Sequence, residues 1–537
     1  MNGRTRSTAR AVMVLGTTSG AGKSWLATAL CRWYARQGLK VAPFKAQNMS
    51  NNARVVPGSG GRLGEIGSAQ YFQALAARVL PDVRMNPVLL KPENDTGSQV
   101  VVLGEVRADL AAVPWRERSE RLWPFAQDAL LALMAENDVV VIEGAGSPAE
   151  INLHASDYVN MRTAQAARAA CLLVSDIDRG GAFAHLYGTH QLLPAAERAL
   201  LRGYVLNRFR GDARLLEPGP QQLLALTGVP TLAVLPMWRG HGLPEEDGLH
   251  DEGPGWQRGA VDAAASLRIA VVAYPRISNL DEFQPLRQLR GVQLRWARSA
   301  EELAGADWIV LPGSKHTSGD LAWLREQRID AALARHAAAR RPVLGLCGGL
   351  QMLGEALVDP HGVEGENGEG NAPGLGLLPL VTAFEPDKLL RRTDACFDGV
   401  GDEWSMLRGV QFGGYEIRHG RSVQHPALPA AAVALRNAEG EAIGWQQGSV
   451  LGLYAHGLFE STEVLRALFG ARVRGLESVF DGLADSSTVI RAGRADAAAG
   501  RRRTRTREGL RWTGHRPPSR PALTQCSPLA CGSASTT

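Results

Sequence analysis

Two strand–turn–helix segments of this chain carry side chains that could do chemistry. In GTTSGAGKS, residues 16–24, three glycines precede a lysine and a serine between an apolar strand and an apolar helix. In GLCGG, residues 345–349, glycines flank a single cysteine in a similar setting. A glycine-rich turn that ends in Gly-Lys-Ser is typical of phosphate binding, and a cysteine on a sharp turn is typical of a nucleophile. The sequence therefore predicts two reaction centres in one chain.

In the first segment, Gly16, Gly20 and Gly22 let backbone N–H groups converge on an anion, and the following helix adds its dipole. We expect Lys23 to reach the β- and γ-phosphates and the Ser24 hydroxyl to coordinate Mg²⁺. The alternative is a tightly packed turn that binds nothing. The strand before the loop, the helix after it and the GKS triplet favour the phosphate site.

Magnesium takes hard oxygen ligands, so this site needs carboxylates nearby. Glu143 ends the apolar run VVVIE, at the carboxyl edge where parallel sheets hold ligands. An unpaired carboxylate there would be costly in a core, which favours a functional role. Glu65 is a second candidate, with a surface helix start as its alternative. Lys45 follows the second strand and could contact a transferring phosphate, whereas the alternative is a solvated loop lysine.

The second segment places Cys347 where a helix N-terminus would activate its thiolate. An oxyanion hole is available from the N–H of Gly348 and from the loop at Gly313 and Ser314. His456 directly follows an apolar strand and is the candidate base, although most single histidines are surface or core residues. A buried structural cysteine is the alternative for the thiol, and its setting between glycines favours the nucleophile.

Both segments need strands to position them, and the apolar runs of the chain supply two series. The first series is apolar on both faces, as in a parallel sheet covered by helices. Its runs are AVMVLG, KVAPF, DVVVIEGAG, ACLLVSDI, RGYVLNRF and PTLAVLPM. The second series contains LRIAVVAYP, GVQLRWA, DWIVLPG, RPVLGLCGG, VALRN and AIGWQQGSVLGLYAHG. These two series predict an α/β fold with two domains.

These series set the expected domain boundaries. Residues 1–240 form the phosphate-loop domain, and residues 267–484 form the cysteine domain. Residues 241–266 are rich in Gly, Pro and charge, which is typical of a linker. Residues 485–537 are Arg-rich and of low complexity, which predicts a disordered C-terminal tail.

Composition excludes several classes of protein. The 537 residues contain no apolar run long enough for a transmembrane helix, and MNGRTRSTAR lacks the apolar stretch of a signal peptide. Six scattered cysteines form no disulfide framework or zinc spacing, so we expect a cytoplasmic protein. The net charge is +5, but residues 485–537 alone carry ten arginines and three acidic residues. The remaining body is therefore slightly acidic and offers no electrostatic case for nucleic acid or membrane partners.

The motifs together resemble a known family. GLCGGLQMLGEAL, with LPGSKHTSGDL before it and GLYAHGLFE after it, resembles the class I glutamine amidotransferase domain of the cobyrinate-amidating, CobB/CobQ-type family. The N-terminal part resembles the P-loop, dethiobiotin-synthetase-like ligase domain of that family. The motifs that carry this likeness are GTTSGAGKS, FKAQNMS, GEIGSAQ, MNPVLLKP, VIEGAGSPAEINL, SDIDRGGAFA and LNRFRGD. They occur in the family's order over roughly residues 11–484.

The resemblance implies a chemistry for each domain. Glutamine would be hydrolysed at Cys347 through a glutamyl thioester, with His456 as base. The ammonia would pass to the ligase domain, where ATP activates carboxylates of a corrinoid substrate as acyl phosphates. The substrate implied is adenosylcobyrinic a,c-diamide, amidated at its b, d, e and g side chains to adenosylcobyric acid of the cobalamin pathway.

The resemblance also assigns roles in the ligase site. Ser24, Glu65 and Glu143 are the implied Mg²⁺ ligands, and Lys23 and Lys45 would serve the phosphates of ATP. Asn207, in LNRF, would read the adenine. No tightly bound prosthetic group is implied.

One position departs from the pattern of most class I amidotransferases. These place a glutamate two residues after the histidine, where this chain has Leu458, and the cobyrinate-amidating branch resembles this chain in lacking it. Glu460 lies four residues after His456 and is not assigned that role.

Two alternative functions stay open, and the oligomeric state is not fixed by the sequence. The nearer alternative is cobyrinic acid a,c-diamide synthesis, against which FKAQNMS and MNPVLLKP speak. The other is a non-catalytic binding protein with degenerate domains. The intact set of Lys23, Ser24, Glu143, Cys347 and His456 speaks against it.

Overall fold

The computed structural model describes residues 9–93, 97–238, 243, 257–258, 267–289, 291–365, 370–470 and 481. All of them belong to one compact unit. The predicted tail, 485–537, lies outside the described residues, as does nearly all of the predicted linker, 241–266. Over the described ranges, no helix combines the length and apolar character that a membrane span requires.

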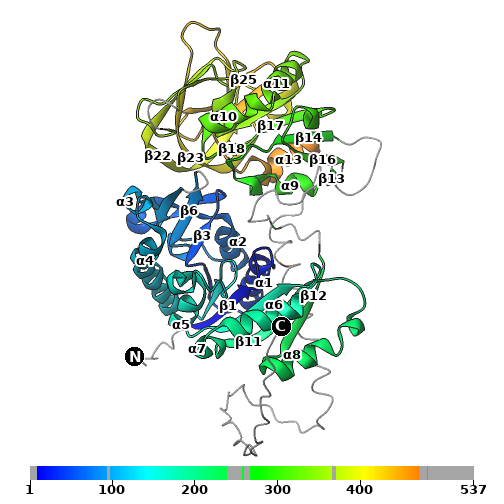
Figure 1. The fold of residues 1–537 in the computed structure, drawn as a ribbon. Helices are drawn as coiled ribbons and strands as arrows, with labels where there is room; N and C mark the ends of the chain where they lie inside the picture. The colour runs from blue at the N-terminus through cyan, green and yellow to red at the C-terminus, as the bar shows by residue number, and fades with distance from the viewer. Residues whose placement is uncertain are drawn as a thin grey trace, which may run out of the picture. The chain divides into compact units, whose positions relative to one another are not determined.

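A six-stranded sheet forms the centre of the N-terminal part (Figure 1). Its order is β12-β11-β10-β1-β9-β2, and each strand is parallel to its neighbours. The strands are β1 (Arg10–Gly16), β2 (Val41–Phe44), β9 (Val139–Glu143), β10 (Ala170–Asp176), β11 (Leu201–Phe209) and β12 (Thr231–Pro236). They coincide with the six apolar runs of the first predicted series, so the predicted parallel sheet is confirmed.

Helices cover both faces of this sheet because the side chains of its strands alternate between two cores. Met13 and Leu15 of β1 pack with α4 (Trp115–Glu136) and α6 (Ala182–Leu192). Val14 packs on the opposite face, with α1 and α2. These two helices are α1 (Lys23–Arg36) and α2 (Ser68–Ala76). The other helices of the N-terminal part are α3 (Ala108–Ala111), α5 (Thr163–Ala166), α7 (Ala195–Arg198) and α8 (Gly219–Thr227).

Between β2 and α4 the chain forms two small sheets that contact the C-terminal part. One contains β3 (Gln47–Met49), β6 (Val88–Pro92), β7 (Ser98–Val102) and β8 (Glu105–Val106). The other is a hairpin of β4 (Ala53–Pro57) and β5 (Leu63–Gly67). Ala53, Leu89 and Val101 form a small apolar cluster against which Ile417 of the C-terminal part packs. These sheets therefore lie at the contact between the two parts of the chain.

The C-terminal part contains a twelve-stranded sheet. A parallel core of β16-β14-β17-β19-β26 continues into antiparallel strands. The core strands are β14 (Leu267–Val272), β16 (Val292–Ala297), β17 (Trp308–Leu311), β19 (Val343–Leu346) and β26 (Val450–Leu453). The others are β13 (Gln257–Arg258), β20 (Ala356–Val358), β21 (Ala372–Pro373), β22 (Leu380–Phe397), β23 (Gln411–Gln424), β24 (Ala432–Asn437) and β25 (Ala442–Gln447).

Short elements complete this part. A separate strand pair joins β15 (Ile277–Ser278) to β18 (Gly313–Ser314). The helices are α9 (Gln284–Arg287), α10 (Thr317–Glu326), α11 (Ile329–Ala338), α12 (Gly348–Leu353) and α13 (Thr462–Phe469). Its 3₁₀ turns include η6 (Leu280–Phe283), η9 (Asp402–Leu407) and η10 (Leu458–Glu460). The predicted α/β class is confirmed for both parts.

The long β22–β23 hairpin is the main element that the sequence did not predict. Its first strand contains Pro386 and a charged run, and its register shifts between Phe384 and Leu389. The charged side chains are accommodated by partners on the neighbouring strand, as where Arg391 of β22 meets Glu416 of β23. The charged side chains interrupt the apolar alternation that would identify a strand. The partners that pair with them lie on another segment, so the sequence of the run alone does not reveal the strand.

The core of the C-terminal part yields a stability prediction. Trp404 of η9 is fully buried, donates from its indole N–H to the Ser449 carbonyl at 2.9 Å, and contacts the Trp308 ring. We expect Trp404→Ala to lower the free energy of unfolding by about 3–5 kcal/mol. Trp115→Ala, at a half-exposed position, serves as control and should change it by about 0.5 kcal/mol or less. Denaturant unfolding measures both, and equal losses would contradict the assigned core.

Candidate active sites

Cys347 occupies the sharp turn between β19 and α12. Its backbone has φ 49° and ψ −105°, a conformation that residues other than glycine rarely adopt. The Cys347 N–H donates to the Leu453 carbonyl at 2.8 Å, which ties the turn to β26. The side chain is largely buried, and Sγ lies 3.5 Å from the carbonyl oxygen of Ile417. The predicted strand–turn–helix setting of the cysteine is confirmed.

His456 comes to Cys347 because their strands are neighbours. Strand β19 pairs in parallel with β26, and Leu346 lies opposite Leu453. Both side chains therefore emerge at the carboxyl edge of the same sheet and line one cavity. His456 is 2 % exposed, and its ring stacks on Tyr415 of β23 with 5.3 Å between centroids.

Glu282 supplies the carboxylate that the sequence lacks after the histidine. Its Oε1 lies 3.2 Å from His456 Nδ1, and its Oε2 accepts from the Gly457 N–H at 3.3 Å. Glu282 is fully buried in η6, 174 residues before the histidine. Sequence reasoning missed it. The available signal was the acidic pair in NLDEF, which is flanked by apolar residues. Glu460, left unassigned above, instead forms an ion pair with Arg54.

The charge state of the site follows from this contact. Burial disfavours a charged imidazole, but the Glu282 carboxylate and the sulfur of Cys347 outweigh it and raise the pKa of His456 to about 10. The ring is therefore protonated at neutral pH. It can stabilise a thiolate and deliver a proton to a leaving group.

The three predicted oxyanion-hole residues lie around this pair. A Cβ placed on Gly348 would lie 2.8 Å from the Ser314 backbone nitrogen, so the two backbones approach closely. A Cβ on Gly313 would lie 3.2 Å from Cε1 of His456. Both positions therefore need glycine for the close approach. The backbones of Gly348 and Ser314 therefore lie against each other next to Cys347.

A cavity of about 140 Å³ opens onto the cysteine and the histidine. A single water needs about a tenth of this volume, so the cavity has room for several water-sized groups. Its walls come from both parts of the chain. The C-terminal part contributes Ser314, Lys315, Gln351, Lys388, Arg418 and His419, among others, and the N-terminal part contributes Asn51, Lys91, Glu93 and Gln99.

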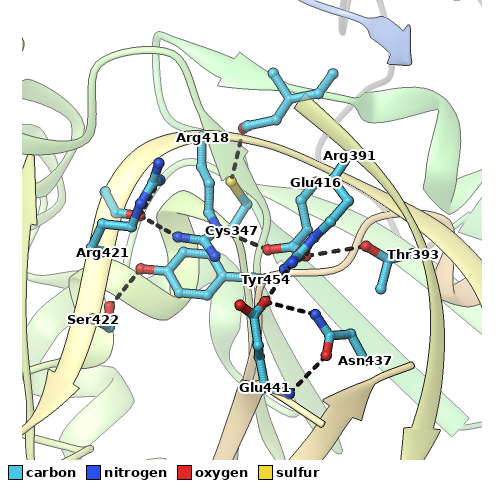
Figure 2. A network of polar contacts seen from close by, with 12 residues as sticks. Cys347, Arg391, Thr393, Glu416, Arg418, Arg421, Ser422, Asn437, Glu441 and Tyr454 are labelled. Carbon is cyan, nitrogen blue, oxygen red and sulfur yellow. Dashed lines mark hydrogen bonds and ion pairs between the residues drawn. The ribbon is translucent and has the colours of Figure 1, made fainter. Parts of the chain in front are cut away.

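A buried polar network fixes strand β23 beside the thiol (Figure 2). Glu416 is fully buried and binds Arg391 at 2.6 Å and Arg418 at 2.8 Å. Arg418 lies over the Tyr454 ring, 3.9 Å from its centroid. Because Ile417 lies between Glu416 and Arg418, the network holds its carbonyl against Cys347. Sequence reasoning missed these residues, which carry no local motif.

The phosphate loop follows β1 in the other sheet, between the ends of β9 and β10. Lys23 donates to the carbonyls of Thr18 at 3.0 Å and Gly146 at 3.1 Å, so its ammonium lies over the loop. Gly20 and Gly22 have φ of 70° and 101°, which explains the glycines. The loop therefore folds as a tight turn between β1 and α1, with the Lys23 ammonium held by carbonyls on two sides.

The structure brings three of the predicted ligase residues together at the end of β9. Glu143 is fully buried, and its Oε1 accepts from Ser24 Oγ at 2.8 Å and from Lys45 Nζ at 3.0 Å. Gln73 donates to the second carboxylate oxygen and was missed. Asn207 lies against the loop, donating to the Ala21 carbonyl at 2.9 Å.

Glu65, the third predicted magnesium ligand, is placed in another cluster. Its two carboxylate oxygens bind Lys91 and Lys388. Burial alone would raise the pKa of Glu65, but the two ammonium groups lower it to about 2. The partners described for Glu65 are thus lysines, whereas Ser24 and Lys45 bind Glu143, and Glu65 as a magnesium ligand stays a prediction. The Glu65 carboxylate lies at the contact between β5 and β22.

Comparisons with known proteins match both parts. Residues 12–240 match the CobQ/CobB/MinD/ParA nucleotide binding domain, and residues 268–464 match the CobB/CobQ-like glutamine amidotransferase domain. The cobyric acid synthase of Methylibium petroleiphilum is 99% identical over 485 residues, which cover 90% of this chain and 96% of that protein. The cobyric acid synthase of Leptothrix cholodnii is 73% identical over 492 residues, with coverage of 90% and 96%.

The Glu282–His456 contact yields a pH prediction. Glu282→Gln keeps the shape of the side chain and removes its charge, so burial then dominates and lowers the pKa of His456 from about 10. Since a raised pKa keeps the imidazole protonated until the pH passes it, the alkaline limit of glutamine hydrolysis should move toward neutral pH. We expect the rate above pH 8 to fall about a hundredfold.

Ammonia release measured across pH 6–11 tests this expectation. Glu463→Gln, which removes an exposed carboxylate of α13, is the matched control and should leave the profile unchanged. An unshifted alkaline limit in Glu282→Gln would contradict the assigned role of Glu282.

Proposed function

The chain belongs to the cobyric acid synthase family, and from this membership we propose the reaction that its two sites perform. The reaction is the ATP- and glutamine-dependent amidation of the b, d, e and g carboxylates of adenosylcobyrinic a,c-diamide, which gives adenosylcobyric acid in cobalamin biosynthesis. One observation carries the proposal. A buried set of Cys347, His456 and Glu282 occurs in the same compact unit as a phosphate loop whose Lys23 and Ser24 lie beside Glu143.

In the amidotransferase site, the Cys347 thiolate attacks the side-chain amide carbon of glutamine. The N–H groups of Gly348 and Ser314 stabilise the oxyanion, with Gly313 allowing the close approach. The protonated His456 gives its proton to the leaving nitrogen, which departs as ammonia and leaves a glutamyl thioester on sulfur. His456, now neutral, takes a proton from water as the water attacks, and glutamate is released. Glu282 holds the ring through Nδ1 in both steps.

In the ligase site, Lys23 and Lys45 would bind the phosphates of ATP, and Asn207 would lie near the adenine side of the loop. Ser24 and Glu143 fit a magnesium ion, because a hydroxyl and a carboxylate lie 2.8 Å apart beside the loop. Magnesium, when bound there, neutralises phosphate charge. The substrate carboxylate attacks the γ-phosphate to form an acyl phosphate and ADP, and ammonia then displaces phosphate to leave the amide.

The domain limits and the setting are part of this proposal. Residues 1–240 form the ligase domain, 241–266 the linker, 267–484 the amidotransferase domain and 485–537 a tail. The described cysteines are free thiols, which supports a reducing cytoplasm. Glutamine, ATP and a corrinoid are the expected partners, and we expect neither nucleic acid nor membrane.

The nearer alternative is the formation of cobyrinic acid a,c-diamide, which amidates two carboxylates rather than four. Counting the mass changes on each corrinoid substrate separates the two reactions.

Cys347→Ala tests the division of labour. With glutamine as donor, we expect the corrinoid mass to stay unchanged, because the thioester cannot form. With ammonium as donor, we expect four successive losses of about one mass unit each, since every OH is replaced by NH₂. Mass spectrometry of the corrinoid measures this. Activity of the variant with glutamine, or failure of ammonium to restore it in folded protein, would contradict the proposal.

Glu143→Gln should give the reverse pattern. Removing this charge should lower amidation with either nitrogen donor about a hundredfold or more, because phosphate and magnesium binding both depend on the site. Glutamine hydrolysis without corrinoid should persist at the parent rate. Glu150→Gln removes an exposed carboxylate of the following loop and serves as control. An equal loss of both activities would count against Glu143 as a ligase residue.

A further inference from the structure

Arg54 belongs to the ligase domain, and its guanidinium lies between the Tyr71 and Phe72 rings of α2 and residues of the amidotransferase domain. It lies on β4, is 2 % exposed, and binds Asp281 of η6 and Glu460 of η10. Its guanidinium also lies 5.1 Å from the centroid of the Tyr415 ring. Asp281 is 227 residues away in sequence, so the ion pair joins the two domains.

Two of these partners, Asp281 and Tyr415, adjoin the groups around His456. Asp281 is next to Glu282, the carboxylate on His456 Nδ1. Tyr415 stacks on the imidazole and pairs with His456 through the backbone. Arg54 therefore contacts the neighbours of the histidine on two elements, η6 and β23, without reaching the reacting atoms.

The charges explain why a cation is required at this place. Asp281 and Glu282 are adjacent buried carboxylates, and Glu460 lies beside them. His456 faces one of them, and Arg54 faces the other two. Without Arg54, the buried Asp281 and the partly exposed Glu460 would lose their cation, so η6 would have to shift or Asp281 would have to take up a proton.

The backbone next to Arg54 fixes the same turn. Asn52 Oδ1 accepts from the Leu280 N–H at 2.9 Å, and Asn279 Oδ1 accepts from the Ala53 N–H at 3.3 Å. Asn279 also donates to the Tyr415 hydroxyl at 3.1 Å, and it has a left-handed backbone with φ 55°. The start of η6 is thus hydrogen-bonded to the ligase domain at Asn52 and at Ala53, the first residue of β4.

We propose that Arg54 is a positioning residue for glutamine hydrolysis, supplied by the ligase domain to the amidotransferase site. It holds η6 so that Glu282 orients His456 toward Cys347. The amidotransferase site is therefore complete only while β4 is seated on η6, and ammonia is made only beside the domain that uses it. This inference rests on the function proposed above.

The test compares three activities of the full-length chain: glutamine hydrolysis, amidation with glutamine, and amidation with ammonium. In Arg54→Met we expect the kcat of the first two to fall about a hundredfold, as for a misplaced catalytic group, with KM for glutamine little changed. Amidation with ammonium should stay within about twofold of the parent, because the phosphate loop is untouched.

The pH profile separates positioning from simple electrostatics. His456 is faced by Glu282, Cys347 and Tyr415, with Asp281, Glu460 and Arg54 behind them. Loss of one positive charge in an unchanged structure would raise the pKa of His456. Displacement of Glu282 would lower it, so positioning predicts an alkaline limit shifted toward neutral pH in Arg54→Met.

Two further variants sharpen the result. Arg54→Lys keeps the charge and should recover part of the glutamine-dependent rate. Arg436→Met removes a half-exposed arginine that pairs with Asp398 on the same domain as the cysteine, and it should leave all three activities unchanged. If Arg54→Met does not fold, Arg54→Lys decides: parallel loss of all three activities would overturn the proposal.

The inference also fails if Arg54→Met hydrolyses glutamine at the parent rate, or if its alkaline limit moves upward. These outcomes differ from failure of the proposed function. In that case the parent enzyme itself would amidate no corrinoid with either nitrogen donor.

Discussion

A buried imidazole that carries a positive charge is the constraint on which the amidotransferase site depends. Burial strongly disfavours that charge, and it persists because the Glu282 carboxylate lies 3.2 Å from Nδ1 of His456 in a poorly hydrated site. Glu282 is itself a buried charge and needs a fixed position. The η6 turn fixes the Glu282 backbone, whose N–H donates to the Asn279 carbonyl at 3.2 Å, and the Gly457 N–H donates to the carboxylate. The Tyr415 ring stacks on the imidazole itself.

Both reaction centres use the same topological arrangement. Each lies where neighbouring parallel strands end, so residues distant in sequence meet at one edge. In the ligase sheet, β1 and β9 bring Ser24 to Glu143. In the amidotransferase sheet, β19 and β26 bring Cys347 to His456. In each case a turn that contains glycine leads from a strand into a helix, from β1 into α1 in one domain and from β19 into α12 in the other.

Residues with local signals could be predicted from the sequence. Apolar runs revealed the strands of both parallel cores, and glycine-flanked turns revealed Lys23, Ser24 and Cys347. Glu282 and Arg54 could not be found in this way, because their partners lie 174 and 227 residues away and neither sits in a glycine-rich turn.

Other parts of the structure escaped prediction for a related reason. The β22–β23 hairpin places charged residues opposite each other across strands, so neither strand reads as apolar alternation. Glu65 occurs in a motif that suggested magnesium, but the position of its carboxylate depends on a lysine 323 residues away. Partners on other strands or in the other domain determine the β22–β23 pairing and the position of Glu65. A single sequence does not show which residues those partners are.

The contact between the domains exchanges charge in both directions. Arg54 of the ligase domain pairs with the buried Asp281 of the amidotransferase domain. Lys388 of the amidotransferase domain pairs with the buried Glu65 of the ligase domain. Leaving one member of such a pair buried alone costs about 3–5 kcal/mol. Separating the domains would expose both sets to water, and a shifted contact would leave charges buried without partners. The two ion pairs therefore stabilise the seated contact. Because the same contact forms the walls of the cavity at Cys347, a seated contact is also the one in which that cavity is complete.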